Sequence, residues 1–192
     1  MESVDIEKGK LYLIGKGSLF HPIMGKSNEY TNWETNFGPG TCEFCANQNG
    51  KIFLVNNPPE LEPPVHPNCH YEIVPMDTIV AGTATIDGAN GVDLVLWNGW
   101  NLPDNYWTKE KAKAQGYNNK IGNLKKVLPD ITIGGDVYEN KIGKLPMASG
   151  RIWYEVDINY LGGYRNSCRV LYSNDGLVFV TYDNYETFYQ II

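Results

Sequence analysis

Three charged side chains, Glu155, Arg165 and Arg169, have the types and the spacing for chemistry at a phosphate ester. Residues 151–160 alternate between polar and apolar side chains, which predicts a half-buried strand with Glu155 on its polar face. The pair Gly162-Gly163 predicts a turn, after which the chain returns through both arginines. A guanidinium offers a planar fork of donors to a phosphate, and a carboxylate beside it can accept a proton. A cross-strand ion pair on a solvated sheet face is the alternative, and spacing alone leaves both open.

A second group of candidate site residues lies near the middle of the N-terminal half. Cys42 and Cys45 form a C-x2-C pair, and His66 and Cys69 follow after a proline-rich passage. Two thiolates three residues apart can bind one zinc ion, and a second pair of ligands can complete its tetrahedral coordination. We therefore predict a structural zinc site with these four ligands. His70 is the substitute if His66 points away. Reduced structural or redox-active cysteines are the alternative, and four protein ligands leave no open position for a catalytic zinc.

The elements that must position these residues fall into two parts with different charge. Residues 1–89 hold 5 Lys and Arg against 11 Asp and Glu, whereas residues 90–192 hold 11 of each. We expect a small, loop-rich, zinc-stapled domain over residues 1–75, because so short a part with few aliphatic side chains needs a staple. Residues 76–90 are rich in Gly, Ala and Thr and predict a linker. A larger domain is expected over residues 91–192. Its net charge is zero, so it is less basic than most nucleic-acid-binding domains, and any binding of nucleic acid would rely on a local cationic cleft.

The larger domain is predicted to be α+β. Apolar runs and turn residues predict short helices over residues 92–100 and 109–115 and a third from residue 122, with Thr108 as the N-cap of the second. After residue 131 the chain consists of short β-branched and aromatic segments joined by Gly, Asn and Asp turns. Helices first and strands afterwards predict short helices packed on an antiparallel sheet.

From about residue 101 onward, the sequence contains a series of distinctive segments. They are LPDNYWTK (102–109), GNL (122–124), IGGDVYEN (133–140), GKLP (143–146), SGRIW (149–153), E-x-DINY (155–160), YRNS (164–167), RVLYS (169–173) and TYDNYETF (181–188). With these segments in this order, the C-terminal half of the chain resembles the barnase-like family of small microbial ribonucleases. The resemblance implies the α+β fold of that family and an endoribonuclease that needs no metal or other cofactor for catalysis.

The resemblance also implies roles for individual residues. Glu155 matches the family's general base, Arg165 and Arg169 match the arginines that hold the scissile phosphate, and Lys109 matches a lysine that helps to neutralise it. The implied substrate-binding positions are Asn140, Lys141 and Tyr185. In the implied reaction the base takes the proton of a ribose 2′-OH and a 2′,3′-cyclic phosphate is released, so single-stranded RNA is the expected substrate and DNA is not.

Two positions depart from the family pattern. The family's general acid is a histidine, and its place is taken by Asn184, which has no pKa near neutrality and cannot donate a proton. We therefore expect this form to be inactive or strongly weakened, either naturally or because a lethal nuclease was disarmed by a His-to-Asn change. The family's base-reading glutamate is replaced by Ile142, so a preference for guanine does not follow from the resemblance.

Residues 40–75 contain the pattern T-C-x2-C, then N-G, then P-x-H-P-N-C. This pattern is similar to the C-terminal cysteine and histidine motif of phage Mu-type head morphogenesis proteins. Where that family often ends in Cys-Arg-Cys, this chain has Cys69-His70-Tyr71, so a family-like final ligand is missing. This resemblance implies that the chain is the tail of a longer phage-like or polymorphic-toxin protein.

These observations predict a ribonuclease toxin domain, inhibited in its producer by a barstar-like acidic immunity protein. The alternative is a catalytically dead ribonuclease fold that serves as a binding or structural module of a phage-like or effector protein. No apolar run approaches the about 18 residues of a membrane span, and the acidic, polar start does not resemble a signal peptide. We therefore expect no membrane partner, and an exported or phage-delivered effector that acts in the cytoplasm of a target cell.

Overall fold

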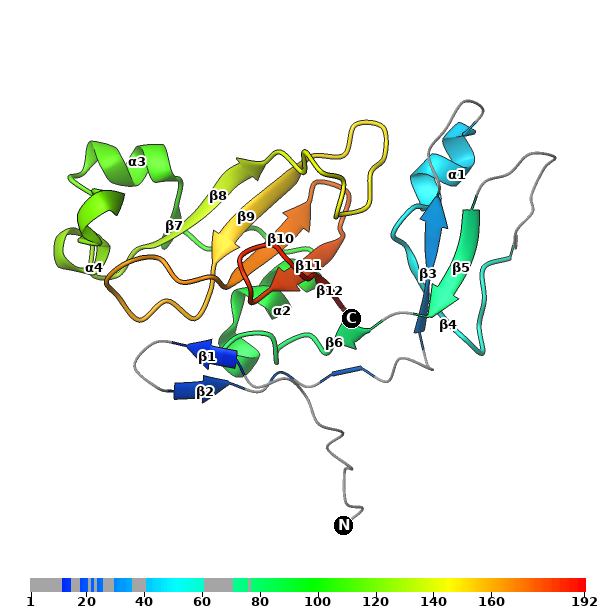
Figure 1. The fold of residues 1–192 in the computed structure, drawn as a ribbon, viewed down its shortest axis with the longest axis horizontal. Coiled ribbons are helices and arrows are strands. Elements are labelled where there is room, and N and C mark those ends of the chain that lie inside the picture. Colours follow the sequence, from blue (N-terminus) through cyan, green and yellow to red (C-terminus); the bar gives the residue numbers. More distant parts are fainter. Residues whose placement is uncertain are drawn as a thin grey trace, which may run out of the picture.

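The computed structural model describes residues 12–14, 18–20, 22, 24–25, 30–35, 41–60, 71–75 and 77–192. Figure 1 shows a large sheet with helices around it, a small sheet beside one end of it, and a short hairpin. The strands are β1 (Tyr12–Ile14), β2 (Ser18–Phe20), β3 (Tyr30–Thr35), β4 (Ile52–Leu54), β5 (Tyr71–Pro75), β6 (Thr78–Ile79), β7 (Tyr106–Trp107), β8 (Thr132–Tyr138), β9 (Trp153–Asp157), β10 (Arg169–Ser173), β11 (Val178–Thr181) and β12 (Tyr189–Ile191). The α-helices are α1 (Glu43–Gln48), α2 (Val92–Trp97), α3 (Lys109–Ala114) and α4 (Leu124–Val127), with 3-10 turns at Gly88–Asn90 and Asn119–Ile121.

The large sheet has the strand order β6-β12-β11-β10-β9-β8-β7. Its interior strands are antiparallel, whereas β6 on β12 and β7 on β8 are parallel. Residue pairing between β9 and β10 sets Arg169 opposite Asp157 and Leu171 opposite Glu155. The predicted α+β class is confirmed for this part of the chain, with short helices before an antiparallel-rich sheet.

Both faces of the large sheet are covered. On one face, α2 packs Val92 and Leu96 against Val156, Val170 and Val180. The opposite face buries a second cluster, which consists of Leu145, Trp153, Leu171 and Phe179. The prediction that β9 is only half-buried, with Trp153 on a polar face, is therefore wrong: Trp153 is buried because the loop residue Leu145 and the β11 residue Phe179 close over it.

Helices α3 and α4 pack at the β7–β8 end of the sheet (Figure 1). Ala112 and Leu124 from the helices meet Ile133 of β8 in a third buried cluster. The start of α3 agrees with the sequence, because the Thr108 side chain accepts a hydrogen bond from Lys111 N as a helix N-cap. This cap fixes the first turn of α3, which carries Lys109.

The segment in which the sequence predicts a linker, residues 76–90, contributes a strand to the large sheet. Thr78 pairs with Gln190, and Ile79 is fully buried. The buried carboxylate of Asp93 in α2 then accepts hydrogen bonds from Gly82 N (2.8 Å) and Ala84 N (3.0 Å). Backbone donors on a buried acid hold this segment against α2.

The small sheet has the order β4-β3-β5 and carries α1 after β3 (Figure 1). Trp33 of β3 is its buried centre, and Phe44 packs edge-on against it with ring centroids 6.0 Å apart. The Cys42 side chain caps α1 by accepting a hydrogen bond from Cys45 N (3.4 Å). Among the described helices, none is long and apolar enough to cross a membrane.

Candidate functional site

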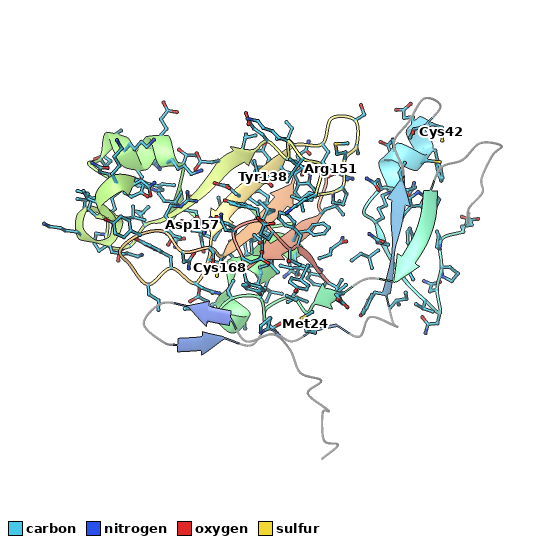
Figure 2. The ribbon with its side chains drawn as sticks, in the orientation of Figure 1. Met24, Cys42, Tyr138, Arg151, Asp157 and Cys168 are labelled. Carbon is cyan, nitrogen blue, oxygen red and sulfur yellow. The ribbon has the colours of Figure 1, made fainter. Side chains whose placement is uncertain are left out.

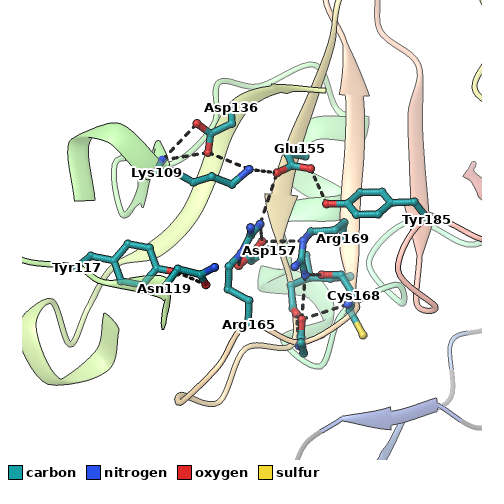
Figure 3. A network of polar contacts seen from close by, with 12 residues as sticks. Lys109, Tyr117, Asn119, Asp136, Glu155, Asp157, Arg165, Cys168, Arg169 and Tyr185 are labelled. Atoms are coloured by element: carbon teal, nitrogen blue, oxygen red, sulfur yellow. Dashed lines mark hydrogen bonds and ion pairs between the residues drawn. The ribbon is translucent and has the colours of Figure 1, made fainter. Parts of the chain in front are cut away.

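Glu155 is the centre of a polar network on the large sheet (Figure 3). Although β9 places this carboxylate in the middle of a sheet face, only 5% of the residue is exposed. Lys109 Nζ donates to its Oε1 (2.5 Å), and the Tyr185 hydroxyl donates to its Oε2 (2.6 Å). Arg165 Nη2 reaches Oε1 at 3.5 Å. A buried carboxylate is thus held ionised by a cation and a hydroxyl on opposite oxygens.

Asp157 binds both arginines of the network (Figure 3). Arg165 donates to it from Nε (2.7 Å) and from Nη2 (2.5 Å), which is the bidentate geometry of strong ion pairs. Arg169 Nε lies 2.9 Å from Asp157 Oδ1, as an ion pair that falls short of a directed hydrogen bond. Asn166 Oδ1 accepts from Arg169 Nη1 (3.1 Å). Asp157 therefore fixes two guanidinium groups beside Glu155.

Lys109 is positioned by the start of α3 and by Asp136 of β8. Its backbone N–H donates to Asp136 Oδ2 (3.0 Å), and its Nζ lies 3.9 Å from the same oxygen. The Lys109 side chain keeps about a third of its surface exposed (36%). The ammonium can thus contact both Glu155 and a ligand that enters from solvent.

The electrostatic environment favours the charged forms of Glu155 and Arg165 and the neutral form of Tyr185. Burial alone would raise the pKa of Glu155, but the hydrogen bonds from Lys109 and Tyr185 and the nearby charges hold this pKa below its usual value. Burial would lower the pKa of Arg165, but Asp157 and Glu155 raise it above its usual value. Burial and the bond to Glu155 both raise the pKa of Tyr185. At neutral pH the site therefore contains an ionised carboxylate, fixed cations and a neutral phenol.

Asn184 lies in a tight turn directly before Tyr185. Its φ is +60°, in the left-handed region that Asn, Asp and His enter more readily than other side chains. Its N–H donates to Ser167 O (3.1 Å), and the side chain is exposed. Asp183 holds the turn by accepting from Glu186 N (3.1 Å) and Thr187 N (2.9 Å). A histidine at position 184 is compatible with this backbone.

The predicted base-binding loop follows β8. Asn140, with φ of +41°, closes the loop through its side chain, which donates to Leu145 O (2.8 Å) and accepts from Leu145 N (3.0 Å). Lys141 points to solvent and pairs with Glu139, while Ile142 is 73% exposed. None of these three side chains therefore touches Glu155. Tyr138, before the loop, stacks on Tyr185 with ring centroids 5.2 Å apart and an interplanar angle of 13°.

The four predicted zinc ligands are only partly covered by the structure. Cys42 Sγ and Cys45 Sγ lie 3.1 Å apart at the start of α1, in the small sheet and distant from Asp157 (Figure 2). The other two, His66 and Cys69, and the substitute His70 lie outside the described residues. Among the residues that are described, no group of three or more His, Cys, Asp or Glu side chains is arranged to hold a metal ion. The zinc site remains a prediction.

Sequence reasoning identified Glu155, Lys109, both arginines and Tyr185, which the structure brings together, but it missed the two carboxylates that position them. Asp157 is 1% exposed, and Asp136 fixes the first turn of α3. Asp157 lies two residues after Glu155, so both side chains are on the same face of the strand. Two buried arginines are also expected to pair with more than one carboxylate. That E-x-D spacing was the available signal; nothing near Asp136 in the sequence indicated its contact with Lys109.

Comparisons with known proteins cover the C-terminal part of the chain. A family model described as ribonuclease matches residues 97–192. A ribonuclease from Heyndrickxia coagulans is 49% identical over 108 residues, which are 56% of this chain and 99% of that protein. Ribonucleases from Bacillus intermedius and Bacillus pumilus are also 49% identical over 108 residues, or 67% of each of those proteins. The likeness to phage head proteins over residues 40–75 lies outside the family match and remains a prediction. Because the family model matches half of its length, and because it covers 99% of one relative and 67% of two others at 49% identity, the chain belongs to the ribonuclease family.

Proposed function

We propose that residues 91–192 cleave single-stranded RNA by transphosphorylation, with Glu155 as the general base. The single observation that carries this proposal is the ionised, buried carboxylate between Lys109 and Tyr185, beside two guanidinium groups fixed by Asp157. An ionised carboxylate can accept a proton, and fixed cations stabilise charge that develops on a phosphate. The resemblance in sequence assigns the same roles to the same residues.

In the proposed reaction, Glu155 accepts the proton of the ribose 2′-OH. The freed oxygen attacks the adjacent phosphorus, and Lys109, Arg165 and Arg169 stabilise the additional negative charge on the phosphoryl oxygens. The bond from phosphorus to the 5′-oxygen then breaks, which leaves a 2′,3′-cyclic phosphate on one product. DNA lacks the attacking hydroxyl and is not a substrate.

The departing 5′-oxygen needs a proton, and Asn184 cannot supply one. Loss of a general acid lowers a rate by about 10²- to 10⁴-fold. We propose that this form is weakened for that reason, whereas the rest of the proposed machinery is in place. The φ of +60° at Asn184 suits histidine as well as asparagine, so the change tests chemistry and not folding.

The deciding experiment compares RNA cleavage by this chain and by its Asn184→His variant. Both are assayed in a chelator with single-stranded RNA and with single-stranded DNA of the same sequence. We expect the histidine to raise the rate on RNA by about 10²- to 10⁴-fold, with cyclic-phosphate ends and no cleavage of DNA.

Two matched variants control this experiment. Asn184→Gln keeps an amide and should not raise the rate. Glu155→Gln in the Asn184→His background should abolish the gain, because the amide cannot accept the 2′-OH proton. An Asn184→His variant that folds yet leaves RNA intact would overturn the proposed function.

The missing general acid also favours a second candidate function, in which the fold binds without cleaving. In that case the chain is a binding or structural module of a larger phage-like or effector protein. Tight RNA binding by the unaltered chain, together with no activity of Asn184→His, would support this second candidate over the first.

We further propose that the active form is a toxin with a dedicated acidic inhibitor and that it acts in the cytoplasm of a target cell. Residues 109–126 hold six lysines and one acidic residue, which gives a local positive surface in a chain of net charge −6. A small acidic protein suits such a surface. Titration of Asn184→His with the product of the neighbouring gene tests this, and undiminished cleavage at excess would refute it.

For the small sheet we propose a structural zinc ion. The pair Cys42 and Cys45 already places two sulfur atoms 3.1 Å apart, and their spacing with His66 and Cys69 is that of zinc ligands. Metal analysis of the purified chain is the test. Zinc at much less than one ion per chain, unchanged by Cys42→Ser, would reject the site.

A further inference from the structure

The turn Asn49-Gly50, which follows α1, joins the small sheet to the ribonuclease part. The Asn49 side chain donates from Nδ2 to Met147 O (3.1 Å) and accepts from Thr35 N (2.9 Å), so it joins β3 to the loop after β8. Gly50 O accepts from Gln190 Nε2 of β12 (3.1 Å). Both turn residues are buried. Three hydrogen bonds thus join this turn to three other segments, which are β3, the loop after β8, and β12.

Close packing accompanies these hydrogen bonds. Gly50 has φ of +85°, and a Cβ built on it would lie 2.6 Å from Pro146 Cβ and 3.0 Å from Leu177 Cδ1. The Gly50 backbone therefore packs so closely against Pro146 that no side chain fits between them. Only glycine combines that φ with this approach.

Arg151 also joins the turn to the same loop. Its Nη1 donates both to Asn49 O (2.9 Å) and to Pro146 O (3.1 Å), while Asp175 holds its other nitrogens. The Arg151 side chain is only 2% exposed. One buried guanidinium thus joins the turn and the loop, and this hydrogen-bonded charge is costly to leave unpaired.

The loop that the turn contacts leads directly into the proposed active site. Leu145 is hydrogen-bonded to Asn140, and Lys144 Nζ donates to Tyr185 O (3.0 Å). Tyr185 in turn donates to Glu155 (2.6 Å). Beside the turn, a cleft of about 540 Å³ separates Asn32 and Thr35 of the small sheet from the wall formed by residues 143–147. The turn therefore holds one end of a loop whose other contacts reach the proposed base.

We propose that the Asn49-Gly50 turn is a positioning element for loop residues 139–147, so that the small sheet sets how tightly the ribonuclease binds its RNA. This inference rests on the proposed function for its kinetic consequence. Asn49 and Gly50 do not touch substrate; they act through Pro146 and Met147. A loop that loses this support binds the substrate base less well before and during the reaction equally, which raises KM and spares kcat.

The test uses Asn49→Asp in the full chain, because aspartate keeps an oxygen for Thr35 N but loses the donor to Met147 O. The matched control is Asn47→Asp, the same change at an exposed position of α1 two residues earlier. In the Asn184→His background, we expect KM for RNA to rise about 3- to 10-fold in Asn49→Asp with kcat within about twofold. In the unaltered background, the backbone N–H groups of residues 143–145 and 147 should exchange hydrogen faster than in the control.

A second variant tests whether the negative charge of the new aspartate, and not the lost contact, causes the effect. Gly50→Ala places a methyl group into Pro146, whereas Gly99→Ala adds one at a φ of +74° with nothing within 4 Å. We expect Gly50→Ala to reproduce the higher KM and the faster exchange, and Gly99→Ala to leave both unchanged.

The outcomes separate this inference from the proposed function. Faster exchange at residues 143–147 with no activity in any histidine variant would support the positioning contact and refute the proposed function. Kinetics and exchange in Asn49→Asp that match those of Asn47→Asp would overturn the inference, even if Asn184→His cleaves RNA. A lowered melting temperature with unchanged KM would also overturn it, because the contact would then serve stability alone.

Discussion

At the scale of single residues, opposing effects set the charge of Glu155. Burial favours the neutral acid, and the bonds from Lys109 and Tyr185 favour the carboxylate more strongly. The pKa of this group therefore lies below its usual value, although the residue is 5% exposed. A carboxylate whose pKa is depressed remains able to accept a proton in mildly acidic solution, which the proposed role of Glu155 as general base requires.

Removal of the Lys109 ammonium should move the acid limb of activity. In the Asn184→His background, Lys109→Ala takes away a hydrogen bond and a positive charge that lower the pKa of Glu155. That pKa then rises, so the base becomes protonated at a higher pH and the fall of kcat/KM on the acid side begins at a higher pH. Measurements of kcat/KM between about pH 3 and pH 7, with and without Lys109→Ala, give the acid limb of each protein.

Lys111→Ala is the control for this shift. Lys111 lies on the same helix, but its Nζ lies 3.9 Å from the centre of the Trp107 ring. Its removal should leave the acid limb in place. Coincident limbs for Lys109→Ala and the unmodified background would contradict the contact between Lys109 and the base.

The sequence indicated Glu155, Arg165 and Arg169 as one site, because antiparallel strands joined by a short turn must bring them together. It did not indicate the direction of their hydrogen bonds. Lys109 shows why: its distance from Glu155 depends on how α3 packs on β8, a long-range contact that no local pattern records. The family resemblance supplied that position where spacing could not.

At the scale of elements, two loops near Arg165 are held together by a close approach of their backbones. Gly122 has φ of +59°, and a Cβ there would lie 2.7 Å from the carbonyl carbon of Gly163 and 2.8 Å from Tyr164 N. Backbone atoms cannot move aside as a side-chain end can. The α3–α4 region is thereby fixed against the loop that carries Arg165.

A methyl group at position 122 should force these loops apart. We expect Gly122→Ala to lower the free energy of unfolding by about 1–3 kcal/mol more than Gly116→Ala does. Gly116 has φ of +92° and open space around it, so alanine there meets only the left-handed strain. Urea denaturation of both variants measures the difference, and equal losses would mean that the two loops do not pack as described.

Strands and helices with strong local patterns were predicted well. The cap at Thr108 and the apolar strands after residue 131 appear where composition placed them. Strand β6 was not predicted, because residues 76–90 are rich in the small residues of linkers, and pairing with β12 depends on a partner far along the chain. The small sheet was likewise not predicted, since β3 mixes polar and aromatic residues.

At the scale of the whole molecule, ionised acids link stability to pH. Hydrogen bonds hold the pKa values of Glu155, Asp175 and Asp183 below their usual values, against the effect of burial. A lowered pKa in the folded state stabilises the fold above the pKa of the unfolded chain, and this contribution is lost as pH falls through the folded value.

We therefore expect stability to fall as the solution is acidified below about pH 4, the region of unperturbed carboxyl groups. Urea midpoints over a pH series measure the fall. The slope should be smaller in Asp183→Asn, which removes one of the titrating groups but keeps an oxygen for the N–H groups of Glu186 and Thr187. A midpoint that does not change with pH in that range would contradict the described bonds.

The pairing of β6 with β12 also bears on where this protein can be divided. The family match begins at residue 97, yet β6 lies before it and completes one edge of the matched sheet. The backbone of Ile192 is bound on both sides by this earlier segment, through Ala81 N (2.8 Å) and Ile79 O (3.0 Å). An edge strand whose backbone N–H and C=O groups are unpaired can pair with a strand of another chain. A fusion protein that contains this ribonuclease part should therefore include the residues from Thr78 onward.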